Sequence, residues 1–409
     1  MSIGKPSGTN CDSTPHICQL IGHDTRNSQV KQLVKLLSWS GNVMLACLLQ
    51  GPGKAVLQNV SIPKLGKKDV LVRLEVAGIC GTDVEKLDGV LGPGGILGHE
   101  VSGTVERLGE SLEEFSKGDR VVAHHHVPCY NCHYCSRGDY TMCDFFKKTN
   151  FDPCGLAEFL RIPEENVERG AIIRMPDDVD FEEAALAEPT ACCLRAIKRV
   201  GVDEGDTALV VGLGPTGLTH VQLLKHYGAR KIIGTDVSGA RLEMARRLGA
   251  SVTLDPVADD VDTVIKDETT IGVDIAIVAA GNPRAFAQAM RSVRKGGRIC
   301  LFGAPPIGSK HELDLHDAFT RQIRIVPSYS CVESEIQETL QLISEGKVDL
   351  ATLITNRYHL QQAVEALENA RSPTSSVKTV IKSGRSEDSI AEPSPNRLAK
   401  KLGNRSAFL

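Results

Sequence analysis

Four cysteines crowd into one short stretch of the chain. Cys129, Cys132, Cys135 and Cys143 are separated by two, two and seven residues, and four thiolates are the number that closes a tetrahedral zinc shell. Free or buried thiols in a loop are the alternative, but such thiols rarely fall at regular intervals. The spacing predicts a structural zinc site that holds a loop and does no chemistry, with His133 as a surplus residue facing solvent.

A glycine pattern further along the chain is typical of dinucleotide binding. It follows the apolar run TALVV and opens the helical pattern GLTHVQLLKHYG. The first glycine allows a tight turn, the second lets the backbone approach a pyrophosphate, and the third allows close packing of helix on strand. The helix N-terminus supplies N–H donors and a positive dipole. Glycines that merely turn the chain are the alternative. The predicted cofactor-binding residues of this turn are Gly212, Leu213, Gly214, Pro215, Thr216 and Gly217.

A carboxylate follows the next predicted strand. Asp236 lies nineteen residues after Gly217, where a carboxylate accepts hydrogen bonds from the adenosine ribose and repels a 2′-phosphate. This favours NAD over NADP. Arg241 keeps NADP open as the less favoured cofactor, because an arginine near the ribose can accept a phosphate; its alternative role is surface ion pairing.

Three further motifs are dispersed along the chain. They are Gly78-Ile-Cys80-Gly-Thr-Asp83, then Gly98-His99-Glu100 with Gly103 after it, and Glu188-Pro189. Taken singly, such residues are more often a core cysteine, a satisfied histidine and a helix-surface charge.

The elements that must position these residues change in character along the chain. Short apolar runs separated by Gly, Pro and Asp predict a β-rich domain over 44–191, with strands over 70–76, 101–108, 120–126 and 157–162. Near-continuous apolar strands then alternate with amphipathic helices over 192–328, which indicates a parallel sheet covered on both faces. Residues 329–382, with helices over 333–346 and 359–371 and a strand near 377–381, are expected to return to the first domain.

Composition bounds the possible partners. The 409 residues are 41% hydrophobic and carry a formal net charge of −4, with 47 Lys and Arg against 51 Asp and Glu. Such a chain is too long for a small peptide module and has no basic excess for nucleic acid. No apolar run reaches the roughly 18 residues that span a bilayer. The clustered cysteines and the polar start, without a signal-like segment, indicate a cytoplasmic protein.

Both ends of the chain differ from its middle. Residues 1–43 lack a period, and two interpretations are open: an artefact upstream of a true start at Met44, or a disordered tail with a short amphipathic helix over 30–37. Residues 383–409 are polar and contain two prolines, so we expect a disordered tail.

Together the motifs resemble the zinc-dependent medium-chain dehydrogenases, the family of alcohol, sorbitol and threonine dehydrogenases. The resemblance covers about 44–382 and includes the catalytic cysteine motif, the Gly-His-Glu motif, the cysteine lobe and the nucleotide fingerprint in the family's order. Glu188-Pro189, after FEEAALA, is similar to the sorbitol and threonine branch, in which a glutamate replaces the second cysteine of alcohol dehydrogenases. The resemblance implies an α/β protein in which a GroES-like β-barrel catalytic domain contains an inserted doubly wound (Rossmann) domain.

The resemblance also implies roles for single residues. Cys80, His99 and Glu188 would ligate a catalytic zinc, with Glu100 as an alternating or water-mediated ligand, and the site would keep one position open for water or substrate. Asp83 would orient His99. Thr82 matches the hydroxyl that takes the substrate proton in this family.

One position departs from the family pattern. Many relatives carry a histidine five residues after the catalytic cysteine, and this chain has Glu85. A carboxylate there could accept the proton if burial raised its pKa, or the proton could leave through the cofactor ribose and water. The tract His124, His125 and His126 falls within the predicted strand over 120–126, where strand packing is expected and a place in the cleft is the alternative.

The predicted reaction is hydride transfer between NAD and a secondary alcohol, with two zincs per chain, one catalytic and one structural. A substrate with a hydroxyl or an amine next to the reacting hydroxyl could use a second position on the zinc. This suits polyols, sugars and amino alcohols such as threonine. A sugar 1-dehydrogenase of the same family and a non-catalytic, zinc-stabilised nucleotide-binding protein are the alternatives. Family resemblance implies a homodimer or a homotetramer.

Overall fold

The computed structural model describes residues 42–91, 95–371 and 376–384. The chain divides into a unit of residues 1–43 and a unit of residues 44–409, and the description below concerns the second. Apart from residues 42–43 and 383–384, the predicted leader, its alternative helix and the predicted tail lie outside the described residues.

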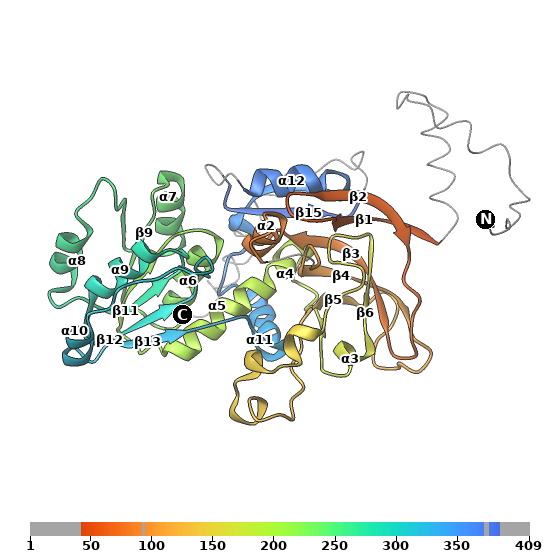
Figure 1. Ribbon diagram of the computed structural model, residues 1–409, viewed down its shortest axis with the longest axis horizontal. Helices are drawn as coiled ribbons and strands as arrows, with labels where there is room; N and C mark the ends of the chain where they lie inside the picture. Colours follow the sequence, from red (N-terminus) through yellow and green to blue (C-terminus); the bar gives the residue numbers. More distant parts are fainter. Residues whose placement is uncertain (1–41, 92–94, 372–375, 385–409) are drawn as a thin grey trace, which may run out of the picture. The chain divides into compact units, whose positions relative to one another are not determined.

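A mainly antiparallel sheet forms the core of the β-rich region (Figure 1). The strand order is β14-β15-β3-β4-β5-β7, with β6 also paired to β3, and β1 and β2 form a separate pair. The last described strand, β15, runs antiparallel to β3, with Val380 opposite Gly78, so it rejoins the sheet formed by β3 and β4. The strands are β1 (Val43–Leu49), β2 (Ala55–Ser61), β3 (Val70–Gly78), β4 (Glu100–Leu108), β5 (Arg120–Ala123), β6 (Phe159–Ile162), β7 (Ile172–Arg174), β14 (Ile354–His359) and β15 (Lys378–Lys382).

A parallel sheet with the order β10-β9-β8-β11-β12-β13 is built from the chain between the two halves of this antiparallel sheet. Its strands are β8 (Thr207–Val211), β9 (Lys231–Thr235), β10 (Val252–Leu254), β11 (Val273–Val278), β12 (Val293–Leu301) and β13 (Arg324–Pro327). The order reverses beside β8, because β9 and β10 extend to one side and β11 to the other. Ligands of open α/β sheets bind at such a switch point, beyond the carboxyl ends of the strands.

Helices cover both faces of the parallel sheet. Ala208 and Val210 of β8 pack into one buried cluster, whereas Leu209 and Val211 pack into another. The first cluster includes side chains of α5 (Ala187–Val200), α6 (Pro215–His226) and α7 (Gly239–Leu248). The second includes those of α8 (Val261–Thr269) and α9 (Pro283–Ser292), and α10 (Leu315–Thr320) precedes β13. The predicted fold class, a GroES-like barrel with an inserted doubly wound domain, is confirmed.

The remaining helices are short, except for α11 (Glu333–Ser344), which packs against α5. Helix α5 also contacts both β4 and β12, so it joins the two sheets. The other α-helices are α2 (Gly81–Leu87), α3 (Glu164–Val167), α4 (Phe181–Ala185) and α12 (Ala363–Ala370), and the 3₁₀ turns are η1 (Cys135–Arg137), η2 (Tyr140–Met142), η3 (Phe146–Lys148), η4 (Ala351–Leu353) and η5 (Leu360–Gln362).

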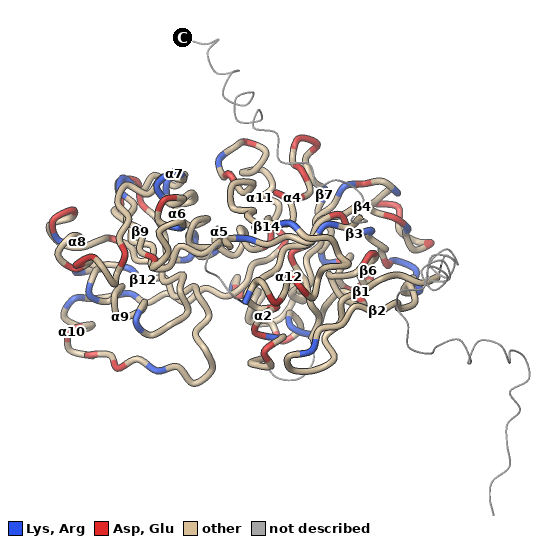
Figure 2. Tube along the Cα trace, turned by 90° about the horizontal axis from the view of Figure 1, so that it is seen from above, with Lys and Arg blue, Asp and Glu red and all other residues tan. Residues whose placement is uncertain are grey.

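Charge is mixed over the described chain. Figure 2 shows Lys and Arg interspersed with Asp and Glu along the trace. Among the described residues, no helix combines the length and the apolar character that a membrane crossing needs.

Two predicted elements differ from their expected bounds by three or more residues at one end. The strand expected over 120–126 ends at Ala123, so the three histidines follow it instead of lying within it. The helix expected over 359–371 begins at Ala363, after a 3₁₀ turn over Leu360–Gln362. The first difference matters for function, because it places the histidines at the end of a strand, where side chains are not held in the sheet's alternation.

Candidate functional site

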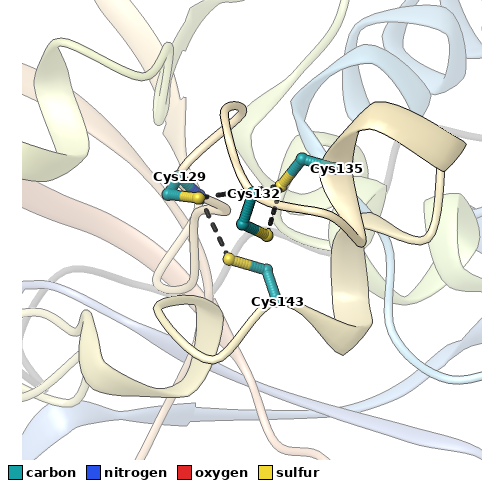
Figure 3. Close-up of side chains that lie close together, drawn as sticks. All are labelled: Cys129, Cys132, Cys135 and Cys143. Carbon is teal, nitrogen blue, oxygen red and sulfur yellow. Dashed lines mark hydrogen bonds between the residues drawn. The ribbon is translucent and has the colours of Figure 1, made fainter.

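The four clustered cysteines face one another in the lobe after β5 (Figure 3). The sulfur atoms of Cys132 and Cys135 are 3.6 Å apart, and those of Cys129 and Cys135 are 3.9 Å apart. A zinc ion with Zn–S bonds of about 2.3 Å spaces tetrahedral thiolates about 3.8 Å apart. Burial and hydrogen bonds with the neighbouring thiols raise the pKa of Cys135 to about 12. The geometry fits a closed four-sulfur shell.

A second group of possible ligands brings together Cys80, His99 and Glu100, whose ligand atoms all lie within 4.8 Å of one another. Cys80 precedes α2, and the two others lie where β4 begins. The Asp83 carboxylate joins the two segments, because it accepts the backbone N–H of Cys80 at 3.0 Å and that of Gly98 at 2.9 Å. Through these two hydrogen bonds, Asp83 of α2 holds the segment of Cys80 next to the segment of His99.

Gly78 makes room for this group. It lies opposite Glu100 in the β3–β4 register, and a Cβ atom at Gly78 would lie 1.9 Å from a Glu100 carboxylate oxygen. Only glycine admits the buried carboxylate at this point of the sheet. The requirement explains the first residue of the Gly78-Ile-Cys80 motif.

The surroundings of His99 favour a positive charge. Its Nδ1 lies 3.5 Å from an Asp83 carboxylate oxygen, and the side chain is buried. Burial alone would lower the pKa of His99, but Asp83 and Cys80 raise it well above its ordinary value. Burial likewise would raise the pKa of Asp83, but His99 holds it below its ordinary value. A cation at this site would meet the same attraction.

Glu100 has a partner that the sequence analysis missed. The Lys378 ammonium nitrogen on β15 lies 2.5 Å from a Glu100 carboxylate oxygen and also donates to the Ile79 carbonyl at 2.9 Å. Both side chains are almost fully buried. The other carboxylate oxygen, Oε1, has no hydrogen-bond partner among the described residues. In the sequence, the lysine within the apolar run VKTVI was the only indication of a buried charge, and it did not show which carboxylate the lysine pairs with.

The two predicted proton-transfer residues lie on α2, in the turns that follow Cys80. Thr82 and Glu85 are both half-buried. Burial raises the pKa of Glu85 above its ordinary value. That shift is the condition under which a carboxylate could serve in place of the histidine found in many relatives.

Glu188 lies in a neighbouring group and not within the Cys80 set. It is buried in the first turn of α5, where its ligand atoms lie within 4.8 Å of those of His124 and His125 and, separately, of Cys192 and Cys331. The Cys192 thiol is 3.7 Å from its carboxylate oxygen. Glu188 also contributes to raising the pKa of Glu100, after burial. Of the four predicted ligands of the catalytic zinc, Cys80, His99 and Glu100 thus form one group, and Glu188 belongs to a neighbouring group.

In the histidine tract, His124 and His125 are buried and His126 is half-buried, and the pKa values of the three differ. Burial lowers the pKa of His126 to about 4 and that of His125 well below its ordinary value. Burial has the same effect on His124, but Cys331 and Glu333 outweigh it and raise the pKa of that histidine to about 10. The rings of His125 and His99 lie 4.9 Å apart. The tract therefore lines the metal-ligand region instead of packing in a strand.

The glycine turn after β8 has the shape that a dinucleotide needs. Gly212 has a φ of +91°, and a Cβ atom at Gly217 would lie 1.9 Å from the Gly212 carbonyl oxygen. A Cβ atom at Gly214 would meet nothing within 4 Å, so this glycine faces open space. The turn borders a cavity of about 810 Å³ that Asp236 and Arg241 also line. Leu213, Pro215 and Thr216 complete the turn and the start of α6.

Asp236 is held in place at the end of β9. Its carboxylate accepts the backbone N–H of Leu213 at 2.8 Å and that of Ser238 at 2.9 Å. The Arg241 guanidinium lies 3.8 Å from the same carboxylate and donates to the Ser376 carbonyl at 3.2 Å. The predicted ribose carboxylate and the arginine that could counter it are therefore neighbours on the cavity wall.

Comparison with known proteins agrees with this arrangement. Residues 66–176 match the model of the alcohol dehydrogenase GroES-like domain, and residues 215–345 match that of the zinc-binding dehydrogenase domain. A sorbitol dehydrogenase from Homo sapiens is 31% identical over 336 residues, which cover 79% of this chain and 92% of that protein. An L-threonine 3-dehydrogenase from Anaeromyxobacter dehalogenans is 30% identical over 325 residues, 77% of this chain and 92% of that protein.

Solved structures share the fold. A protein from Sinorhizobium meliloti 1021, solved bound to NADP, superimposes with a TM-score of 0.76 at 28% identity and covers 83% of this chain and 99% of its own.

Proposed function

This chain belongs to the zinc-dependent medium-chain dehydrogenases, and we propose that within this family it oxidises the secondary hydroxyl of a polyol, a sugar or an amino alcohol with NAD. It is an alcohol or polyol oxidoreductase of the sorbitol and threonine dehydrogenase branch. One observation carries the narrower proposal. The chain brings together the possible metal ligands Cys80, His99 and Glu100, and it also has a glycine turn of the shape that a dinucleotide needs.

The residues present fit the two implied groups. Cys80, His99 and Glu100 would hold the catalytic zinc, with Glu188 beside them, and the cysteine lobe would hold the structural zinc, which makes two per chain. The orphaned Glu100 carboxylate oxygen and the anionic surroundings of His99 support a cation at the first site. When bound, zinc would polarise the substrate hydroxyl as a Lewis acid, and the nicotinamide would accept the hydride.

The chain's own residues would position and deprotonate the substrate. Asp83, whose carboxylate oxygen lies 3.5 Å from His99 Nδ1, would orient the ring of His99 when a metal is bound. The Thr82 Oγ1 atom would take the hydroxyl proton and pass it on. The Glu85 carboxylate, whose pKa burial raises, is the proposed next acceptor, and the cofactor ribose and water form the alternative route.

Asp236 supports NAD as the cofactor. Two backbone N–H groups hold its carboxylate at the cavity wall, where it would accept the ribose hydroxyls and repel a 2′-phosphate. A structural relative was solved with NADP, so the preference of this chain for NAD over NADP needs a direct test. We expect Asp236→Ser to lower kcat/KM with NAD by about 10- to 100-fold, the cost of hydrogen bonds to a charged group, and to narrow the gap to NADP. A wild-type preference for NADP would overturn the assignment.

Metal analysis with substrate screening tests the activity. The purified full chain is assayed for zinc content and for turnover of polyols, aldoses, threonine and simple alcohols with NAD and NADP. Loss of one zinc and of turnover in Cys80→Ser, but not in Cys193→Ser, is the expected result. Cys193 is the control, because it is a buried cysteine that donates to the Thr216 carbonyl and belongs to none of the groups of possible metal ligands among the described residues. Retention of zinc and turnover in Cys80→Ser would refute the catalytic assignment.

Two broader features complete the proposal. A homodimer or homotetramer and a cytoplasmic location are expected from the family and from the clustered thiols. Turnover of aldoses at C1, in preference to polyols, would instead favour the sugar 1-dehydrogenase reading. Light scattering of the purified chain measures the oligomeric state.

A further inference from the structure

Two cysteines that the proposed chemistry does not use lie against Glu188. Cys192 is one turn after Glu188 on α5, and Cys331 comes from the segment just before α11. The ligand atoms of all three residues lie within 4.8 Å of one another. Cys331 is fully buried and Cys192 is half-buried. Elements far apart in the sequence therefore bring two thiols to one carboxylate.

The distances match those between ligands that share one metal ion. The Glu188 carboxylate oxygen is 3.7 Å from the Cys192 sulfur and 4.0 Å from the Cys331 sulfur. With Zn–S bonds of about 2.3 Å and Zn–O bonds of about 2.1 Å, tetrahedral geometry spaces sulfur and oxygen about 3.6 Å apart. The side chains need to move only a few tenths of an ångström to enclose an ion.

A fourth donor, His124, comes from the neighbouring group of possible ligands that shares Glu188, and its orientation is typical of metal ligands. The Nε2 atom of His124 lies 3.9 Å from the Cys331 sulfur. Its other ring nitrogen, Nδ1, lies 3.3 Å from the Glu333 carboxylate, which also accepts the Tyr130 hydroxyl. Metal-binding histidines usually give their second nitrogen to a carboxylate in this way. In the first group, His99 Nδ1 lies somewhat farther from its carboxylate, 3.5 Å from Asp83.

From these observations we propose that Glu188, Cys192, Cys331 and His124 bind a soft divalent cation such as Zn²⁺, in a site separate from both the cysteine lobe and the Cys80 group. Two thiolates, an imidazole and a carboxylate form a set that favours zinc over magnesium or calcium. The ion ties α5 to the start of α11. Because a carboxylate has two oxygens, Glu188 can serve this site and still face the catalytic ion.

Metal stoichiometry of the full chain tests the proposal. We expect about three zinc equivalents per chain after dialysis against a weak chelator, and about two in Cys331→Ser and in Cys192→Ser. Cys193→Ser is the matched control and keeps the wild-type content, because Cys193 neighbours Cys192 in sequence but bonds to the Thr216 carbonyl. Replacing zinc by Co²⁺ gives a second readout, since each variant loses thiolate-to-cobalt absorption that the control keeps. Circular dichroism confirms that the variants fold.

Two outcomes would overturn the proposal. One is a zinc content in Cys331→Ser and Cys192→Ser equal to that of Cys193→Ser. The other is an intact mass of the native chain that shows Cys192 and Cys331 joined as a disulfide. The proposed function fails differently: it predicts that Cys80→Ser loses a zinc equivalent and turnover, whatever the content of Cys331→Ser. The two failures are therefore distinguishable.

Discussion

The buried ion pair between β4 and β15 gives a stability prediction that depends on the close approach of two charges. The Lys378 nitrogen lies 2.5 Å from the Glu100 carboxylate, and both side chains are at most 4% exposed. At an effective dielectric constant of about 20, their gross attraction is about 7 kcal/mol, most of which offsets the cost of removing both charges from water. In the chain without bound zinc, Lys378→Met leaves Glu100 as an unpaired buried carboxylate.

We therefore expect Lys378→Met to lower the free energy of unfolding by about 3–5 kcal/mol. Lys382→Met is the matched control, because Lys382 lies on the same strand and pairs with Glu182 at 3.2 Å, but its side chain is 34% exposed. Its loss should cost at most about 1 kcal/mol. Urea unfolding followed by circular dichroism, on protein freed of metal by a chelator, measures both values without a zinc ion at Glu100.

A double substitution separates loss of the pair from loss of packing. Lys378→Met combined with Glu100→Gln removes the uncompensated charge, so it should be more stable than Lys378→Met alone. The reasoning is refuted if Lys378→Met costs no more than Lys382→Met, or if the double substitution is the less stable of the two. Either result would mean that Glu100 is neutral or solvated in the folded chain.

Three shorter predictions follow from other described residues. Burial lowers the pKa of His220 to about 4, so between pH 6.5 and pH 4 the unfolded chain binds a proton that the folded chain does not bind. On going from pH 7 to pH 5, the free energy of unfolding measured in urea should therefore fall by about 2 kcal/mol more in wild type than in His220→Leu. Equal decreases in the two proteins would contradict the shift. The small apolar cluster of the cysteine lobe includes the four cysteines themselves, so the lobe has little other core to hold it. Cys143→Ser should therefore release one zinc and make the lobe the first site of proteolysis. A variant that is not cleaved there would argue against a lobe held by zinc. Glu85→Gln should lower kcat by about 10²-fold or more and remove the acidic limb of the pH–rate profile if Glu85 carries the proton, whereas an unchanged profile would assign the proton to the ribose route.

Features governed by local spacing could be predicted from the sequence. The glycine turn, the cysteine lobe and most strands of the parallel sheet depend on residues within about one βαβ unit, so their types and intervals carry the information. The predicted strand over 70–76 is observed as Val70–Gly78, and the predicted helix over 333–346 as Glu333–Ser344. The strand over 120–126 was overextended, because three histidines after an apolar run carry no signal for where the pairing with β4 stops.

Partners that are distant in sequence could not be predicted. Lys378 and Ile79 are 299 residues apart, and His124 and Glu333 are 209 residues apart. Nothing in the local pattern around a buried lysine or a histidine names its partner, since the partner is chosen by the return of β15 to β3 and by the packing of α11 on α5. Resemblance to a family supplied the order of the motifs, but not the separation of Glu188 from the Cys80 group.

The same long-range closure explains why the site is where it is. Asp83 joins Cys80 to Gly98 through backbone N–H groups, so the first metal group is held by two segments of the N-terminal half. Glu100, at the edge of that group, finds its counter-charge only on the last strand of the chain. Because the parallel sheet is inserted between these two halves, the electrostatic environment of Glu100 is complete only after the whole inserted domain has been made and β15 has paired with β3. We therefore expect metal binding at the Cys80 group to be coupled to closure of the chain. An ion that binds only the closed fold would stabilise that fold by an amount that grows with the free ion concentration.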